Sequence, residues 1–155
     1  MIEKYKVIKQ AISLEMASFI FDYFILKKKV VNNLFQNRLI SPYTKLWGHW
    51  KDTQVLNTYS IYGDTLAESL LLKLKPIMEE TTGDKLIEMY SYSRVYKNGD
   101  ILYKHIDRKS CELSTTLFIG GEKWPIYLDG TKIDLDQGDM LIYKGCEQVI
   151  DYLFF

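Results

Sequence analysis

The sequence of 155 residues has little of several features, and each scarcity argues against a class of protein. Its two cysteines, Cys111 and Cys146, are too few for a disulfide framework, and we expect both to be reduced thiols. No stretch approaches the roughly 18 apolar residues of a membrane span, so no membrane segment is expected. Twenty basic residues balance twenty acidic ones, which leaves no global attraction to nucleic acid or anionic lipid.

What remains is the composition of a globular protein, with 47% apolar and 26% charged residues. Residues 1–6 contain no apolar core of signal-peptide length, so we expect a cytoplasmic protein, in the host cytoplasm if the chain is viral. At this length the chain is expected to form a single domain over residues 1–155 with one sizeable core.

Two helices are predicted in the first half of the chain. Ser13 can cap the first, whose apolar residues recur at helical spacing and whose end is expected near Lys27–Lys29. The run Thr65–Glu68 has capping-box spacing and begins the second helix, which Gly83 is placed to end. Pro76 predicts a kink or a break in this helix.

A long aromatic loop is expected between these helices, over residues 38–61. Loops of this length in a compact domain tend to be lids or binding loops. Trp47 and Trp50 therefore either contribute to binding or cover the edge of the core, and the sequence leaves both interpretations open.

After Gly83 the pattern changes to short strands separated by turns. A long strand is predicted over Leu86–Tyr96, and a short first strand precedes the helices at Tyr5–Ile12. Further strands are predicted at Leu113–Ile119, Trp124–Leu128, Thr131–Leu135, Met140–Tyr143 and Val149–Phe155. This order predicts an α+β domain: residues 1–83 form a helical buttress with the aromatic loop, and residues 84–155 form a jelly roll, or double-stranded β-helix, with an incomplete C-terminal part.

The candidate for chemistry is a His-x-Asp pair, His105 and Asp107, which follows the turn signal Asn98-Gly99. Residues two positions apart on an extended chain point to the same side. An imidazole and a carboxylate so placed supply two of the three ligands of a 2-His-1-carboxylate iron site. A bare His-x-Asp is nevertheless common, and its default interpretation is a surface histidine near an aspartate on an unrelated sandwich.

Four segments together resemble the iron(II)- and 2-oxoglutarate-dependent dioxygenases, in particular the compact phage and bacterial form of the prolyl 4-hydroxylase-like subgroup. They are Tyr90–Gly99, His105–Ser114, Trp124–Tyr127 and Gly138–Glu147. The resemblance implies a jelly-roll fold buttressed by N-terminal helices, iron(II) and 2-oxoglutarate as cofactors, and ascorbate in a supporting role. It further implies hydroxylation of a prolyl or related residue in a peptide, a protein or a free amino acid, with no nucleic acid or membrane partner.

The resemblance also implies roles for individual residues. His105 and Asp107 match the first two iron ligands, and Tyr96 matches a tyrosine that hydrogen-bonds a 2-oxoglutarate carboxylate. Thr115 matches a hydroxyl contact to the same co-substrate, although the register leaves Ser114 or Thr116 open. Arg108, as the candidate catalytic residue, and Trp124 are expected near the substrate mouth. The alternative for Tyr96 is a core strand tyrosine.

The sequence departs from this pattern after Glu147, where the family would place a distal histidine ligand and, later, a basic partner for 2-oxoglutarate. No histidine follows His105, and no lysine or arginine follows Lys144. Three explanations are open: a truncated or internally deleted dioxygenase, a degenerate member kept as a module, or a site completed by another residue such as His49 or Glu147. We therefore expect weak or absent turnover, and the alternative function is a catalytically inactive jelly-roll module that binds a partner or has a structural role.

Overall fold

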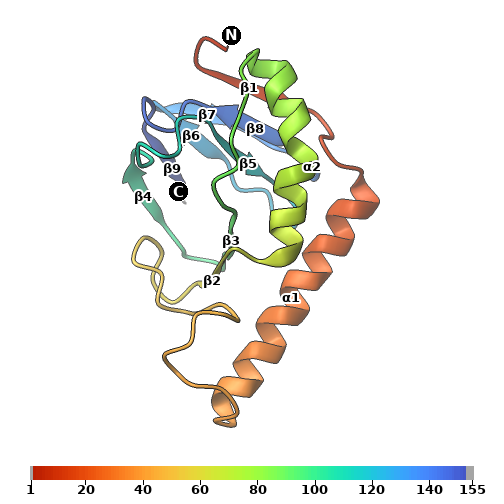
Figure 1. Cartoon of the computed structure of the whole chain (residues 1–155). Helices are drawn as coiled ribbons and strands as arrows, with labels where there is room; N and C mark the ends of the chain where they lie inside the picture. Colours follow the sequence, from red (N-terminus) through yellow and green to blue (C-terminus); the bar gives the residue numbers. More distant parts are fainter. Residues whose placement is uncertain (1, 153–155) are drawn as a thin grey trace.

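The computed structural model describes residues 2–152, in which two long helices lie on the same side of a set of short antiparallel strands (Figure 1). The helices are α1 (Leu14–Gln36) and α2 (Thr65–Thr82). The strands are β1 (Tyr5–Ile8), β2 (Tyr59–Tyr62), β3 (Tyr92–Val95), β4 (Leu102–His105), β5 (Ser114–Leu117), β6 (Ile126–Leu128), β7 (Thr131–Ile133), β8 (Met140–Tyr143) and β9 (Ile150–Tyr152).

The strands form one sheet in the order β1-β8-β5, a second in the order β4-β9-β6-β7, and a separate pair β2-β3. All pairings are antiparallel. Leu141 of β8 is buried in one cluster with Leu128 of β6 and Ile150 of β9, so the two larger sheets pack face to face. This mixture of helices and antiparallel sheets agrees with the predicted α+β class.

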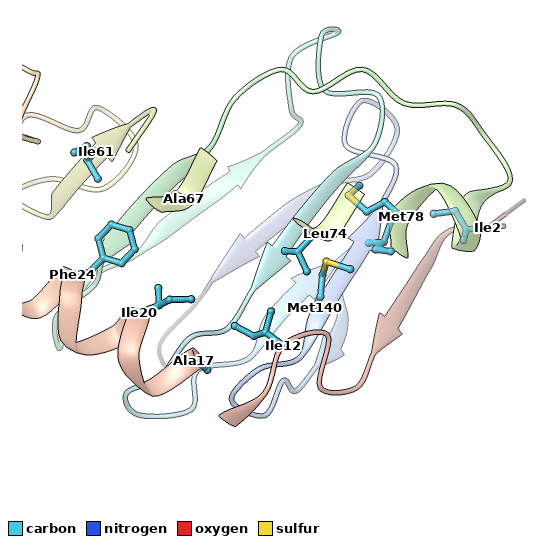
Figure 2. Close-up of a cluster of buried hydrophobic side chains, with 11 residues drawn as sticks. Ile2, Ile12, Ala17, Ile20, Phe24, Ile61, Ala67, Leu74, Met78 and Met140 are labelled. Carbon is cyan, nitrogen blue, oxygen red and sulfur yellow. The ribbon is translucent and has the colours of Figure 1, made fainter. Parts of the chain in front are cut away.

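The opposite face of β8 packs against the helices. Figure 2 shows Ile20 and Phe24 of α1 in one apolar cluster with Leu74 of α2 and Met140 of β8. All four residues of β8 are consequently buried, which agrees with its unbroken apolar sequence Met-Leu-Ile-Tyr. None of the helices within residues 2–152 combines the length and the apolar character needed to cross a membrane.

Helix α1 begins where the sequence predicts but ends later. Ser13 is its N-cap, and the Ser13 hydroxyl accepts a hydrogen bond from the Met16 amide at 3.2 Å. The predicted end near Lys27–Lys29 is wrong, because the helix continues to Gln36 with Val31 buried. Lys27 does not neutralise a helix end but forms an ion pair with the buried carboxylate of Asp64.

Helix α2 begins one residue earlier than the capping-box prediction, with Asp64 rather than Thr65 as its cap. The Asp64 carboxylate accepts from the Leu66 amide at 3.0 Å. The helix runs through Pro76 without a break and ends at Gly83, whose φ of 80° confirms the predicted left-handed cap.

The long strand predicted over Leu86–Tyr96 is wrong, since only Tyr92–Val95 is a strand. The preceding backbone bonds to α2 instead: the Leu86 amide donates to Glu79 and the Ser91 amide donates to Glu68. The other predicted strands are present but mostly shorter, and the predicted residues Leu153–Phe155 lie outside the described residues. Residues 1–83 supply the predicted first strand, β1, and also β2, which begins at Tyr59 inside the predicted loop, so the predicted end of that loop is wrong.

Candidate functional site

His105 and Asp107 converge at the end of β4. The Nδ1 atom of His105 lies 2.8 Å from the carbonyl oxygen of Tyr103, which can only accept a hydrogen bond. In the neutral ring the proton therefore resides on Nδ1, and Nε2 keeps its lone pair. This Nε2 atom lies 3.8 Å from Oδ1 of Asp107, so that one nitrogen and one carboxylate oxygen face a common point.

The other oxygen of Asp107 is held by the protein. Oδ2 accepts hydrogen bonds from the Ser114 hydroxyl at 2.7 Å and from the Tyr143 hydroxyl at 3.2 Å. The Asp107 amide donates to the carbonyl of Gly145 at 2.9 Å. Such contacts orient a metal-ligating carboxylate and leave one oxygen for the ion. The geometry thus suits the binding of a divalent cation by two protein ligands.

Gly145 allows this close packing. A Cβ atom at Gly145 would lie 2.5 Å from the carbonyl oxygen of Cys111 and 2.8 Å from Oδ2 of Asp107, and it would also overlap the Ser114 hydroxyl. Only a residue without a side chain fits between these groups. The segment after β8 is therefore pressed directly against the Asp107 carboxylate.

An apolar residue lies opposite His105 on the neighbouring strand. Strand β9 pairs with β4 so that Ile150 lies directly opposite His105, and directly opposed residues place their side chains on the same face. Ile150 is only 3% exposed and packs against Leu128 and Leu141. No three His, Cys, Asp or Glu residues gather as a metal site anywhere within residues 2–152.

The two substitutes considered from the sequence, His49 and Glu147, therefore do not complete the site within the described chain. His49 is tied by two backbone hydrogen bonds to Ser60 of β2, at 2.8 and 2.9 Å. Glu147 points to solvent and forms an ion pair with Lys144 at 3.3 Å. Within residues 2–152, neither residue joins His105 and Asp107 in a group of three metal-ligating side chains.

Tyr96 lies in an aromatic cluster beside the site. Its ring centroid is 5.0 Å from that of Trp124 and 5.8 Å from that of Tyr152. Burial raises the pKa of Tyr96, so its hydroxyl remains a hydrogen-bond donor at neutral pH. Both interpretations of Tyr96, a core tyrosine and a contact to a carboxylate, are compatible with this position.

A buried ion pair in the cavity wall was not predicted from the sequence. Nε of Arg94 on β3 lies 2.7 Å from Oδ2 of Asp52, and the two side chains are 14% and 3% exposed. Burial alone would raise the pKa of Asp52, but hydrogen bonds from Arg94 and from the Gln54 amide hold it well below its usual value. The position of Arg94 as a cation among Tyr90, Tyr92 and Tyr96 is a sequence signal that could have found it, whereas nothing marks Asp52 within the long loop.

Thr115 lies on the side of β5 that faces the helices. It pairs with Ile142 of the helix-side cluster, and its hydroxyl donates to the carbonyl of Leu141 at 2.9 Å. Ser114 and Thr116 lie on the opposite face, between the sheets. Of the three hydroxyl residues considered for the co-substrate contact, Ser114 and Thr116 therefore face the site, whereas Thr115 does not.

Arg108 is exposed beside the site, with its guanidinium 5.7 Å from the centroid of the Tyr90 ring. Its carbonyl accepts hydrogen bonds from the Cys111 amide at 2.8 Å and the Cys146 thiol at 3.2 Å. Both cysteines are free, as expected. Contacts to Asp107 from Ser114, Tyr143 and Gly145 were not predicted.

One cavity of about 1820 Å³ connects the predicted positions. It is lined by the six residues to which the resemblance assigns a place in the site, which are Tyr96, His105, Asp107, Arg108, Thr115 and Trp124. This volume exceeds the roughly 300–1,000 Å³ of a typical small-molecule site, so the cavity has room for more than a cofactor.

Comparison with known proteins gives a structural match and no sequence match: no family model and no curated protein matches the chain. A crystal structure of a prolyl-4-hydroxylase from Pseudomonas putida has a TM-score of 0.68 with this structure at 9% sequence identity. The match covers 97% of this chain and 84% of that chain. The chain therefore has a prolyl-hydroxylase-like fold. At this identity the likeness concerns the fold alone.

Proposed function

We propose that this protein is a divalent-cation-binding member of the iron(II)- and 2-oxoglutarate-dependent dioxygenases, directed at a prolyl or related residue and slow in turnover. The observation that carries the proposal is the convergence of Nε2 of His105 and Oδ1 of Asp107, each with its other polar atom engaged by the protein. Such outer contacts are typical of metal ligands.

The residues present fit a cation bound by two protein ligands but not the complete three-ligand site. His105 and Asp107 would hold the ion, while Ile150 closes the third direction. When bound, iron(II) with 2-oxoglutarate supplies oxygen activation for C–H hydroxylation. Ser114 and Tyr143 orient the Asp107 carboxylate, and the apolar wall around Ile150 excludes water.

The fit for 2-oxoglutarate is poor. Arg94 is a buried cation near Tyr96, but Asp52 already occupies its Nε and Gln54 its guanidinium edge. A carboxylate desolvated without a cationic partner would lose roughly 2–5 kcal/mol of binding free energy. This is the second reason, beside Ile150, to expect slow turnover.

A second candidate function follows from the same two observations. Because Ile150 and the Asp52–Arg94 pair both obstruct the oxidation chemistry, the chain also suits a catalytically inactive binding module with this fold. The two candidates share the cavity and differ in whether the cation site supports turnover.

Calorimetric titration with manganese(II) tests the cation site. We expect binding that is lost in His105→Ala and kept in His49→Ala, because only His105 faces a carboxylate oxygen at close range. Absence of binding to the wild-type chain would refute the dioxygenase assignment and leave the binding module.

Succinate release tests turnover, with 2-oxoglutarate and a proline-rich peptide as substrates and iron(II) as the added metal. We expect slow release that His105→Ala abolishes. Fast release would contradict the closed third position, whereas manganese binding without any release would favour the inactive module.

A further inference from the structure

Two strands that line the cavity each have an edge without a partner strand. Within residues 2–152, β5 pairs only with β8, and β3 pairs only with β2. All four residues of each strand line the same cavity, and both strands lie beside the helices (Figure 1). Unpaired strand edges are templates for pairing with another chain.

The backbone direction of β5 identifies the groups that point into the cavity. In an antiparallel ladder, alternate residues direct their N–H and C=O groups toward the same neighbour. The Phe118 amide donates to the Asp139 carbonyl at 3.0 Å. Thr116 and Ser114, two and four residues earlier, therefore also direct their backbone groups toward β8. The amide and carbonyl groups of Thr115 and Leu117 consequently face away from β8, toward the cavity.

The same reasoning applies to β3. Ser60 of β2 exchanges two hydrogen bonds with His49 on the far side of β2, at 2.8 and 2.9 Å. Ser60 is opposite Arg94, so this pair exchanges no backbone hydrogen bonds. The backbone groups of Arg94, and of Tyr92 two residues earlier, therefore also face the cavity.

The burial of the side chains agrees with β5 being an edge strand and β8 a central strand. All four residues of β5 are partly buried, without the alternation of a strand exposed on one face, whereas all four residues of β8 are buried. The cavity lining includes unbroken runs at residues 84–98 and 105–124. A run of consecutive lining residues means that the backbone itself borders the cavity.

The two sides of this gap differ in polarity. On the helix side, Val95 and Leu117 pack against the apolar cluster shown in Figure 2. On the other side the strands present Ser114, Thr116 and Arg94. The charge of Arg94 is balanced by Asp52, so a neutral polar side chain is the complementary occupant on this side.

We propose that the gap between β3 and β5 binds an extended, uncharged peptide strand of a partner protein, with apolar residues at every second position. The strand would add to both edges by backbone hydrogen bonds, as in β-augmentation. Each edge is four residues long, which corresponds to about 13 Å of extended chain at about 3.3 Å per residue. The proposal needs no bound metal and stands apart from the proposed function.

A synthetic peptide tests the proposal with the full chain. The probe is a fluorescein-labelled nonapeptide, Lys-Thr-Val-Thr-Val-Thr-Val-Thr-Lys, and the controls carry N-methyl groups on either the valine or the threonine amides. Each methylation removes the donors toward one edge while keeping every side chain. We expect fluorescence anisotropy to show at least ten-fold weaker binding for both controls. Equal affinity, or no binding of the unmodified probe up to millimolar protein, would overturn the proposal.

Amide hydrogen exchange by NMR locates the peptide. We expect exchange at Tyr92, Arg94, Thr115 and Leu117 to slow on binding, because their amides face the gap. The Thr116 amide faces β8 already, so its exchange should change little. Protection that appears only at the aromatic loop, residues 38–57, would refute the assigned gap.

A matched pair of variants tests β5. Thr115→Pro removes a cavity-facing amide, which an edge strand tolerates, while Thr115→Val keeps it. We expect loss of peptide binding only in Thr115→Pro; equal binding by both would contradict the proposal. If Thr115→Pro does not fold, the N-methylated peptides decide alone.

Two other occupants are distinguished by separate measurements. A dimer in sedimentation velocity that the peptide dissociates would assign the gap to a second copy of the chain. Peptide binding that requires deletion of Leu153–Phe155 would assign it to the chain's own C-terminal residues. Either result would overturn the partner-peptide proposal.

Discussion

Ile150 on β9 lies directly opposite His105 on β4, so a buried apolar side chain lies beside the candidate cation site. We predict that Ile150→His raises manganese(II) affinity at least ten-fold, because the new imidazole would share a face with His105. Calorimetry measures the affinity, and Ile150→Phe is the control with a ring but no ligand atom. A folded Ile150→His with unchanged affinity would show that this position does not face the ion.

We predict that the Ser114 hydroxyl positions Asp107 for metal binding. Ser114→Ala removes a 2.7 Å hydrogen bond to Oδ2 and leaves Tyr143 as the remaining side-chain donor. Removal of such an outer contact typically weakens metal affinity 10–100-fold. The same titration checks this, with the exposed Ser110→Ala as control. Equal affinities of the two variants would exclude a positioning role for Ser114.

We predict that Gly145→Ala is destabilising and weakens the cation site. Its new methyl group would lie 2.5 Å from the Cys111 carbonyl, a backbone atom that cannot move aside easily. Overpacking of this kind lowers the free energy of unfolding by up to about 3 kcal/mol. Urea denaturation measures the loss. Gly99→Ala, with nothing within 4 Å of the added methyl group and only an unfavourable φ of 83°, should lose about 1 kcal/mol.

We predict that the Asp52–Arg94 pair makes stability depend on acid pH. The native pKa of Asp52 lies below the value of about 3.9 that an aspartate has in the unfolded chain. The folded state therefore binds fewer protons, so the stabilisation is present above about pH 4 and is lost as pH falls below it.

Urea denaturation between about pH 2 and pH 6 tests this dependence. Asp52→Asn should make the profile shallower, because the lowered pKa values of Asp100 and Asp139 still contribute to it. It should also lower stability at neutral pH by roughly 3 kcal/mol, because Arg94 is left without its partner. The control is Asp134→Asn, since Asp134 belongs to an exposed pair with Lys132 at 3.1 Å and should change stability by less than about 1 kcal/mol. An unchanged profile in Asp52→Asn would contradict the role of the pair.

Features set by local chemistry were predictable. The cap at Ser13, the left-handed end at Gly83 and the buried run Met140–Tyr143 follow from propensity and hydrophobic pattern alone. Strand lengths were not predictable, because segment 86–91 has the pattern of a strand yet its first and last amides, Leu86 and Ser91, donate to glutamates of α2. Competition between a neighbouring strand and a helix side chain is settled only in three dimensions.

The sequence by itself determined that His105 and Asp107 share one face, since that depends only on the two-residue period of an extended chain. It also showed that no histidine follows them. Tertiary structure alone decided what stands beside His105, because the antiparallel register brings Ile150, 45 residues away in sequence, opposite it. It likewise decided that Asp52 neutralises Arg94 and that β3 and β5 border one cavity with free edges, since pairings between distant segments depend on how the whole chain packs.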